Sequence, residues 1–420
     1  MIFYFRNMKF LLFSIAVMLS GCNNAGQNPA PEKAVQKPEK EIHEKKKIIT
    51  GAERTAHYLP LIKDKKVAIV ANQTSLIGDA HLVDSLLERG VNITKIFCPE
   101  HGFRGIAGPG EIIDDDTDKK TGLPVISLYG NHKKPTAKDL QQVDMVIFDI
   151  QDVGVRFYTY VSTMHYVMEA CAENDVTFLV LDRPNPNGFL VDGPVLDLKF
   201  KSFIGMHPVA LAHGMTIAEY ARMINDEKWL RDSVHCHLEY IPCENYTHDS
   251  LYILPVKPSP NLPNMTSVYL YPSMGLFEGT VVSVGRGTSA PFQCYGHPAY
   301  PDTTYSFTPK SMPGTGKYMK FKNRKCYGRN LEHLKITTFI EKKQISLQWL
   351  IDAYNKISTD RFFNTAFPKL AGTDKLQEQI IRGVSEEQIR ESWQEELRTF
   401  KNIRKKYLLY PDTGETPEKQ

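Results

Sequence analysis

The first candidates for chemistry are two glutamates with apolar neighbours. Glu100 lies between Pro99 and His101 just beyond a short apolar run, and Glu278 lies between Phe277 and Gly279. A carboxyl group in such surroundings can have a raised pKa and donate a proton. Two carboxyl groups facing each other across a cleft are the minimum for glycoside hydrolysis, so both are candidate catalytic residues. The alternative for Glu100 is a structural glutamate that caps a helix or forms a salt bridge.

Three arginines, Arg156, Arg183 and Arg286, lie in loops bounded by glycine or proline. Arginine binds a planar carboxylate through two parallel hydrogen bonds, so these loops indicate an anionic substrate. The alternative is that each arginine pairs with a neighbouring aspartate. Asp149 and Asp152 lie three residues apart in a predicted turn, where they can bind a cation, serve acid–base chemistry or bind sugar hydroxyls. Asp149 can also simply cap the following segment.

Other chemistries find less support in the sequence. No GxGxxG fingerprint, P-loop, GxSxG elbow or HExxH pair is present, which disfavours nucleotide enzymes, serine hydrolases and zinc proteases. His235 and His237 would share one face of a strand, but no third metal ligand is evident, so we expect no metal site. Several tyrosines can stack on a sugar ring or be half-buried structure: Tyr158, Tyr160, Tyr269, Tyr271 and Tyr295.

The candidates depend on strands that position them. Short apolar runs predict buried strands at 66–71, 94–98, 124–129, 145–149 and 176–181, with helical patterns over 82–90 and 164–174. This alternation predicts an α/β fold with a mainly parallel sheet. Polar loops follow four of the strands, starting at Asn72, Pro99, Asp149 and Asp182. Ligands of open α/β sheets bind beyond the carboxyl ends of the strands, so these loops predict one shared site.

The second half has a different pattern, which predicts a smaller α+β domain. Thr216 and Glu219 form a capping box at the start of a helix that runs to Trp229. A β-like stretch covers 235–241, a proline-rich passage covers 257–264, and a glycine-punctuated loop and strand covers 276–288. Helical patterns return at 345–357, 373–382 and 385–406. We place the first domain at 49–214, the second at 215–410 and a polar tail at 411–420.

Composition limits the class of protein. The 420 residues are 42% hydrophobic and 24% charged, with a net charge of +3, which indicates globular domains and gives no sign of nucleic-acid binding. Residues 10–19 form an apolar run behind Arg6 and Lys9, and small residues precede Cys22. This pattern predicts a bacterial lipoprotein signal peptide at 1–21, with acylation of Cys22 and a flexible tether at 22–48. The alternative is an ordinary signal peptide with an incidental cysteine. The prediction is an exported, lipid-anchored protein of the periplasm or cell envelope.

Several long motifs occur together in one order: Pro99–Gly105, Asp149–Tyr160, Asp182–Pro186, His213–Thr216, Phe277–Thr280 and Ser283–Thr288. In these motifs the chain resembles the NamZ-type exo-β-N-acetylmuramidases of glycoside hydrolase family 171, long catalogued as a family of unknown function. The resemblance covers about residues 50–410. It implies a Rossmann-like first domain, a smaller second domain and an active-site cleft between them. It also implies release of N-acetylmuramic acid from the non-reducing end of peptidoglycan fragments, without a cofactor.

The resemblance favours Glu100 as the catalytic acid, and Glu278 is the weaker candidate for the second carboxylate. The lactyl carboxylate of muramic acid agrees with the argument from the arginines. The predicted substrate-binding residues come from the polar loops: Asn72, His101, Arg104, Asp149, Gln151, Asp152, Arg156, Tyr158, Asp182, Arg183, Asn185, His213 and Arg286.

Two alternatives to the muramidase stay open. One is a surface lipoprotein that binds muramyl ligands in the same cleft without cleaving them. The other is a glycosidase of the same fold that acts on another N-acetylated or acidic sugar. The sequence decides neither the oligomeric state nor the stereochemical outcome of hydrolysis.

Overall fold

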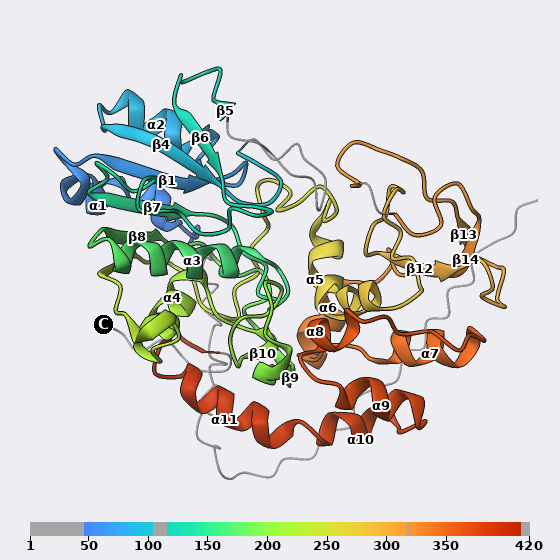
Figure 1. Ribbon diagram of the computed structural model, residues 1–420. Coiled ribbons are helices and arrows are strands. Elements are labelled where there is room, and N and C mark those ends of the chain that lie inside the picture. Colours follow the sequence, from blue (N-terminus) through green and yellow to red (C-terminus); the bar gives the residue numbers. More distant parts are fainter. Residues whose placement is uncertain (1–45, 104–115, 317–318, 413–420) are drawn as a thin grey trace, which may run out of the picture. The chain divides into compact units, whose positions relative to one another are not determined.

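A seven-stranded sheet organises the first half of the molecule in the computed structural model, which describes residues 46–103, 116–316 and 319–412. Its strand order is β11-β8-β7-β1-β4-β6-β5, and all neighbours are parallel except β5 and β6 (Figure 1). The strands are β1 (Val67–Ala71), β4 (Ile93–Cys98), β5 (Asp116–Thr117), β6 (Pro124–Ser127), β7 (Met145–Asp149), β8 (Thr177–Leu181) and β11 (Leu238–Ile241). All five strands predicted from apolar runs are present, and the α/β fold class is confirmed.

Helices cover both faces of this sheet. α1 (Thr55–Ile62) and α2 (Leu82–Glu88) pack on the face that carries Ile69 and Ile147. α3 (Tyr160–Glu173) and α4 (Ile217–Asp226) pack on the opposite face, which carries Val70 and Phe148. Every residue of β1 and β7 is buried, which explains why these strands appear in the sequence as continuous apolar runs.

The sheet continues beyond residue 214, where the sequence analysis placed a domain boundary. The predicted capping box of Thr216 and Glu219 opens α4, which packs against the sheet. Strand β11 then pairs in parallel with β8, with Leu238 opposite Phe178. The position of the boundary stays a prediction, but about 25 residues on its far side contribute to the sheet and its cover.

The strand order places a topological switch point between β1 and β7. From β1 the chain first moves outward to β4 and β6, then returns to β7 on the other side of β1 and continues to β8 and β11. The loops beyond the carboxyl ends of strands at such a point diverge and leave a crevice. The polar loops after β1, β4 and β7 therefore meet at this edge of the sheet.

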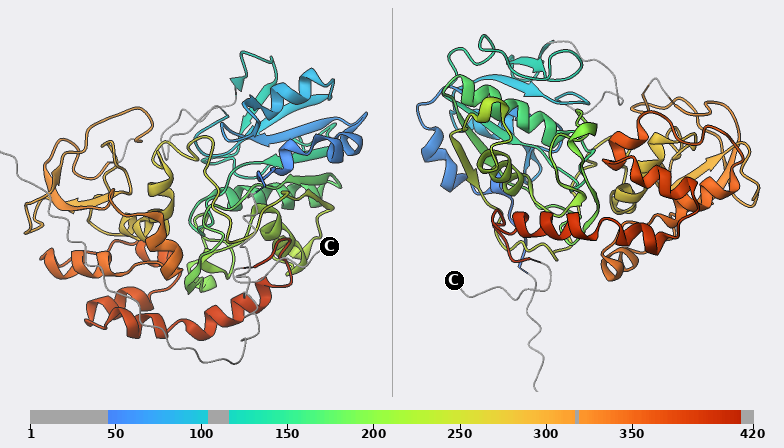
Figure 2. Two further views of the ribbon diagram at one scale, coloured as in Figure 1. Left: turned by 180° about the vertical axis from the view of Figure 1, so that it is seen from behind. Right: turned by 60° about the horizontal axis from the view of Figure 1, so that its bottom comes forward.

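Beyond the large sheet the chain forms short helices and small antiparallel sheets, of which β9–β10 precedes residue 214 and β12–β14–β13 belongs to the second half (Figures 1 and 2). β9 pairs antiparallel with β10, and β14 lies between β12 and β13 in an antiparallel sheet. The remaining elements are β2 (Leu76–Ile77), β3 (Ala80–His81), β9 (Val191–Val195), β10 (Ala210–His213), β12 (Cys294–His297), β13 (Ser306–Phe307), β14 (Cys326–Asn330), α5 (Met265–Met274), α6 (Ile336–Lys342), α7 (Gln348–Lys356), α8 (Phe367–Ala371), α9 (Lys375–Ile381), α10 (Glu386–Glu391), α11 (Gln394–Arg404) and four 3-10 turns, η1 (Gly51–Glu53), η2 (Leu198–Phe200), η3 (Arg231–Ser233) and η4 (Gly275–Gly279).

Two predictions for this half need correction. The helical pattern over 385–406 is two helices, α10 and α11, separated at Ser392 and Trp393. The Ser392 hydroxyl donates to the Ile389 carbonyl at 2.7 Å, and the buried Trp393 leaves helical geometry. The stretch 276–288 begins as the 3-10 turn η4 rather than as a loop and strand.

The described residues from Lys46 onward form one compact unit, and one large hydrophobic cluster runs through both halves. It joins α3 and α4 to side chains of α5, α7 and α11. Among the described residues, no helix combines the length and apolarity needed to span a membrane. The predicted signal peptide and Cys22 lie outside the described residues.

Candidate active site

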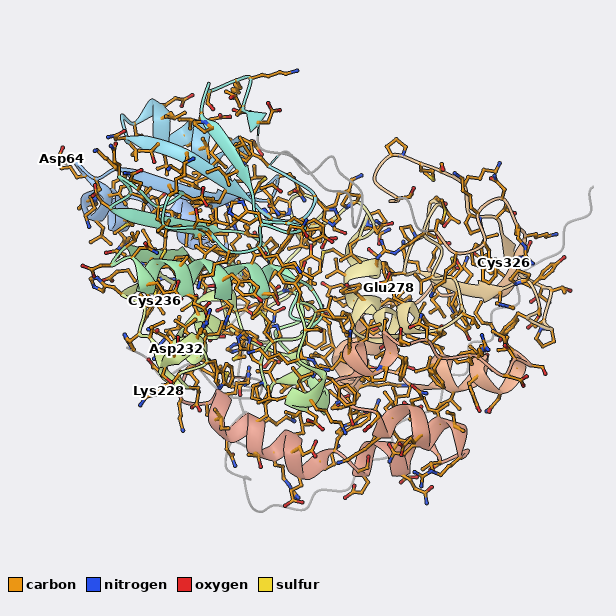
Figure 3. The ribbon with its side chains drawn as sticks, viewed as in Figure 1. Asp64, Lys228, Asp232, Cys236, Glu278 and Cys326 are labelled. Atoms are coloured by element: carbon orange, nitrogen blue, oxygen red, sulfur yellow. The ribbon has the colours of Figure 1, made fainter. Side chains whose placement is uncertain are left out.

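Both predicted catalytic glutamates line a single cavity of about 250 Å³. Glu100 enters it from the loop after β4, and Thr159 and Tyr160 enter it from the start of α3. Glu278 comes from η4, the turn that follows α5 in the second half (Figure 3). The structure therefore brings together two carboxyl groups that are 178 positions apart in the sequence.

Glu100 is partly buried at the carboxyl end of β4. Its Oε2 accepts a hydrogen bond from the Thr159 hydroxyl at 3.1 Å. His101 lines the same cavity and has a φ of 76°, a left-handed conformation that few residues other than glycine adopt. The chain therefore turns sharply directly after Glu100, and such strained positions are common next to functional groups.

Glu278 is held by Arg286 through only one of its two carboxylate oxygens. The Arg286 Nε and Nη2 both donate to Oε1, at 2.9 and 2.7 Å. Among the described residues, no donor reaches Oε2, so this oxygen is available to a ligand. The Arg286 guanidinium also lies over the Phe292 ring, 5.0 Å from its centroid. Gly279 lets η4 approach α8 closely, since an added Cβ would lie 2.5 Å from the Phe367 Cα.

Lys320 stabilises the turn that carries Glu278. Its Nζ donates to the carbonyls of Phe277, Glu278 and Val282 at 3.0, 3.2 and 3.1 Å. Burial lowers the pKa of Lys320 to about 8, and the nearby Glu278 carboxylate partly opposes this effect. A partly buried cation therefore lies behind the turn.

An aromatic wall encloses the cavity. Tyr158 contacts Tyr160 and Tyr271 edge to face, and Tyr271 contacts Phe157 and Phe292 in the same way. All five rings line the cavity. A wall of this kind can stack on the apolar face of a sugar ring. Of the tyrosines considered in the sequence analysis, Tyr269 and Tyr295 do not line it.

Asp149 and Arg183 form a buried ion pair with each other, and their role in substrate binding stays a prediction. The Arg183 Nε donates to Oδ1 of Asp149 at 2.6 Å, and Nη2 donates to Oδ2 at 2.8 Å. The Arg183 side chain is 2% exposed and that of Asp149 is 0% exposed, and neither lines the cavity. The alternative that an arginine pairs with a neighbouring aspartate therefore holds for Arg183.

Arg156 makes structural contacts, and its predicted role in substrate binding is not tested by them. Its guanidinium is buried and donates to four backbone carbonyls, at Pro194, Val209, Leu370 and Ala371. Two of these lie in the first half of the chain and two in α8. Burial lowers the pKa of Arg156 to about 10. The side chain therefore joins the two halves and does not line the cavity.

The remaining predicted binding residues form the scaffold behind the cavity. Asp152 accepts from the Gly154 backbone at 2.7 Å and lies 3.6 Å from the His213 Nε2. Asp182 accepts from the α4 backbone at Ala218, and burial raises its pKa to about 7. The rest are buried, make internal hydrogen bonds and do not line the cavity: Asn72, Gln151 and Asn185. Two buried oxygens of this group, Gln151 Oε1 and Asp152 Oδ1, have no hydrogen-bond partner among the described residues.

Of the predicted binding residues, His101, Tyr158 and Arg286 do line the cavity. Arg104 lies outside the described residues. The prediction missed several lining residues: Tyr129, Phe157, Thr159, Phe203, Ser259, Asn261 and Phe292. Thr159 belongs to the motif Asp149–Tyr160 and directly precedes α3. Its position at the start of a helix that follows a strand is a signal that could have identified it. Phe203 and Phe292 carry no local signal, because any apolar residue in a loop has the same appearance in the sequence.

Among the described residues, no three His, Cys, Asp or Glu side chains gather in a way that could hold a metal ion. Cys236 and Cys243 lie seven positions apart, a spacing that leaves open a disulfide between them. The six cysteines after Cys22 are all buried and free, so Cys236 and Cys243 do not pair.

Two carboxyl groups and an arginine, in an aromatic cavity beyond the strands of a parallel sheet, are an arrangement suited to glycoside hydrolysis. Two family models match this chain. The model of the N-terminal part of exo-beta-N-acetylmuramidase NamZ matches residues 67–266, and the model of its C-terminal part matches residues 269–410. This chain therefore belongs to the NamZ family.

Known relatives agree with this assignment. The chain is 38% identical over 389 residues to peptidoglycan beta-N-acetylmuramidase NamZ of Bacillus subtilis (strain 168). The alignment covers 87% of this chain and 92% of that protein. Two solved structures of DUF1343 family proteins from Bacteroides fragilis NCTC 9343 are also similar. The first has a TM-score of 0.82 and 49% sequence identity, and the match covers 88% of this chain and 100% of that chain. The other has a TM-score of 0.71 at 27% identity, with 86% and 99% covered.

Proposed function

We propose that this protein is an exo-acting β-N-acetylmuramidase that releases N-acetylmuramic acid from the non-reducing end of peptidoglycan fragments. Family membership supports this function, and so does the muramidase activity in the name of the Bacillus subtilis relative. The observation that carries the proposal is the meeting of Glu100 and Glu278 in one cavity with Arg286.

In this proposal Glu100 donates a proton to the glycosidic oxygen as the bond to the sugar breaks. The Thr159 hydroxyl, bound to Oε2, fixes the orientation of the carboxyl group. Glu278 faces the sugar as the second carboxylate, which stabilises the positive charge that develops in an oxocarbenium-like transition state. The aromatic wall stacks on the sugar ring. A water molecule that enters the cavity then adds its oxygen to the anomeric carbon and gives up a proton to a carboxylate, which completes the hydrolysis.

Arg286 has a second role in this scheme as the partner of the lactyl carboxylate. Its Nε and Nη2 are used by Glu278, whereas Nη1 donates to no group among the described residues. It is the only one of the three predicted carboxylate-binding arginines that lines the cavity, because Arg156 and Arg183 are bound internally. A neutral sugar without the lactyl group would lack this contact.

Hydrolysis of para-nitrophenyl β-N-acetylmuramide by the full-length protein in detergent tests the function. We expect nitrophenol release by the wild type and a loss of at least about a hundredfold in Glu100→Gln. Glu239→Gln, an exposed glutamate on β11, is the matched control and should keep full activity.

The other outcomes separate the alternatives. Activity that persists in Glu100→Gln would retain the enzyme and remove Glu100 as the acid. No release by folded wild type would favour a protein that binds muramyl ligands without cleaving them. Release from another N-acetylated or acidic sugar, in preference to the muramide, would identify a different glycosidase.

We further propose that the protein is an exported bacterial lipoprotein, anchored through acylated Cys22 and carried on the tether at 22–48. The apolar run and the small residues before Cys22 support this localisation. Incorporation of a labelled fatty acid by the wild type, and its absence in Cys22→Ser, is the expected result. Equal labelling of both would contradict the anchor.

A further inference from the structure

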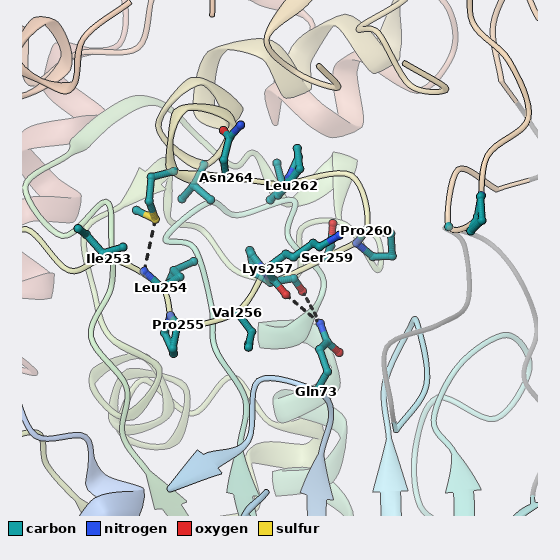
Figure 4. A pocket seen from close by; sticks show the side chains of 16 residues that line it. Gln73, Ile253, Leu254, Pro255, Val256, Lys257, Ser259, Pro260, Leu262 and Asn264 are labelled. Carbon is teal, nitrogen blue, oxygen red and sulfur yellow. Dashed lines mark hydrogen bonds between the residues drawn. The ribbon is translucent and has the colours of Figure 1, made fainter. Parts of the chain in front are cut away.

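A second hollow has a volume of about 780 Å³ (Figure 4). The proline-rich segment 253–265 forms most of its wall, together with Gln73 after β1 and the turn at Pro313 and Gly314. Ser259 and Leu262 line both this groove and the catalytic cavity. The two hollows are therefore neighbours that share one wall.

The shared wall is fixed in place from both sides. The Pro258 carbonyl accepts from the hydroxyls of Tyr158 and Tyr160, at 2.8 and 3.4 Å, on the cavity side. On the groove side the Gln73 Nε2 donates to the same carbonyl at 3.1 Å and to the Lys257 carbonyl at 3.2 Å. Four prolines between 255 and 263 restrict φ along the segment, so the groove is largely preformed.

The groove is apolar but contains two polar features that point to a ligand. Leu254, Val256 and Met265 line it, and Ile253 at its mouth is 76% exposed. Exposed apolar surface of this kind often marks a binding site. The Gln73 Oε1 is a buried acceptor with no partner among the described residues, and the Lys257 side chain is exposed at the rim.

These features match the part of a glycan that leaves the enzyme. An N-acetylated saccharide presents apolar ring faces and methyl groups, amide N–H donors for an acceptor such as Oε1, and lactyl carboxylates for a cation such as Lys257. An exo-acting enzyme holds one terminal sugar in its cavity, so the rest of the chain must pass over an adjoining surface. We propose that this groove binds the saccharide on the leaving-group side of the scissile bond; this inference rests on the proposed function.

Val256→Asp and Lys257→Gln test the inference with two substrates. The tetrasaccharide of alternating N-acetylmuramic acid and N-acetylglucosamine, with muramic acid at its non-reducing end, reaches the groove. The nitrophenyl group of para-nitrophenyl β-N-acetylmuramide is a single ring. We expect Val256→Asp to raise KM for the tetrasaccharide by a factor at least about ten times larger than its factor for the nitrophenyl substrate. For Lys257→Gln the corresponding ratio should be about three.

A binding measurement separates this inference from the proposed function. In a Glu100→Gln background, calorimetry should show about tenfold weaker tetrasaccharide binding after Val256→Asp, with the affinity for free N-acetylmuramic acid unchanged. Lys228→Gln, at an exposed lysine that does not line the groove, is the charge control. It should change neither the tetrasaccharide affinity nor the affinity for N-acetylmuramic acid. Equal tetrasaccharide affinity with and without Val256→Asp, or an equal loss for both ligands, would overturn the groove's role. Failure of the proposed function would instead appear as no hydrolysis by the wild type.

Discussion

Polar side chains beyond the sheet strands fall into two groups with different partners. Glu100 faces the cavity together with Glu278 and Arg286 from the second half. Asp149 ends β7 and Arg183 follows the neighbouring strand β8, but the two side chains pair with each other inside the protein. We call the first the cavity group and the second, together with Arg156, the scaffold group.

The difference between the groups lies in exposure and in unused hydrogen-bonding capacity. Glu278 and Arg286 are 31% and 18% exposed and keep Oε2 and Nη1 available. The scaffold pair is almost fully buried, with the main donors and acceptors matched. Ligand binding requires unused capacity at a surface, whereas burial of a charge requires that its capacity be used. Substitutions should therefore reduce activity in one group and stability in the other.

Glu278→Gln should produce the largest effect in the cavity group. We expect kcat for the nitrophenyl substrate to fall by about a hundredfold or more. The free energy of unfolding should change by less than about 1 kcal/mol, because the pair with Arg286 is partly exposed. Urea unfolding and initial rates measure the two effects, with the exposed Glu391→Gln of α10 as control. Full activity with lowered stability would move Glu278 into the scaffold group.

Asp149→Asn should mainly affect stability. It leaves the Arg183 guanidinium buried without its counter-charge, so we expect the free energy of unfolding to fall by about 3–5 kcal/mol. Activity per folded molecule should stay within about threefold of wild type. Asp64→Asn, at an exposed position after α1, serves as the matched control in urea unfolding. Unchanged stability together with lost activity would show that Asp149 belongs to the cavity group.

Arg156→Met should have a smaller effect on stability. Four carbonyls lose a donor, but the change also removes a buried charge that has no carboxylate partner. We expect a loss of about 2 kcal/mol by chemical unfolding, compared with almost none for Arg382→Met on the surface. A variant as stable as wild type would mean that other contacts hold the two halves together.

Lys320→Met removes three hydrogen bonds together with a partly buried charge, so we expect its smallest effect at pH 7 and a clear effect on the pH dependence. The folded pKa of about 8 lies below the ordinary value of 10.5, so the unfolded chain binds the proton more tightly. The free energy of unfolding of the wild type should therefore increase as pH rises above 8, by at most about 1 kcal/mol per pH unit. The variant should lack this increase in unfolding measurements between pH 7 and 10. A parallel increase in the variant would assign it to another group.

Much of the fold could be predicted because its signals are local. Five apolar runs predicted five strands, and the capping box of Thr216 and Glu219 correctly placed the start of α4. Strand β11 was found only as a β-like stretch, since nothing near Leu238 shows that it pairs with Phe178. The separation of α10 from α11 was missed because burial of Trp393 depends on the rest of the molecule.

The sequence by itself determined the chemical types available at the sheet edge and the long motifs that define the family. It could not determine which of the carboxylates and arginines face a ligand. That choice depends on which partner each side chain meets: Arg183 meets Asp149, Arg156 meets the carbonyls of α8, and Glu278 meets Glu100 across the cavity. These partners are tens to hundreds of positions apart, so only the packing of the two halves decides between a buried ion pair and a reactive one.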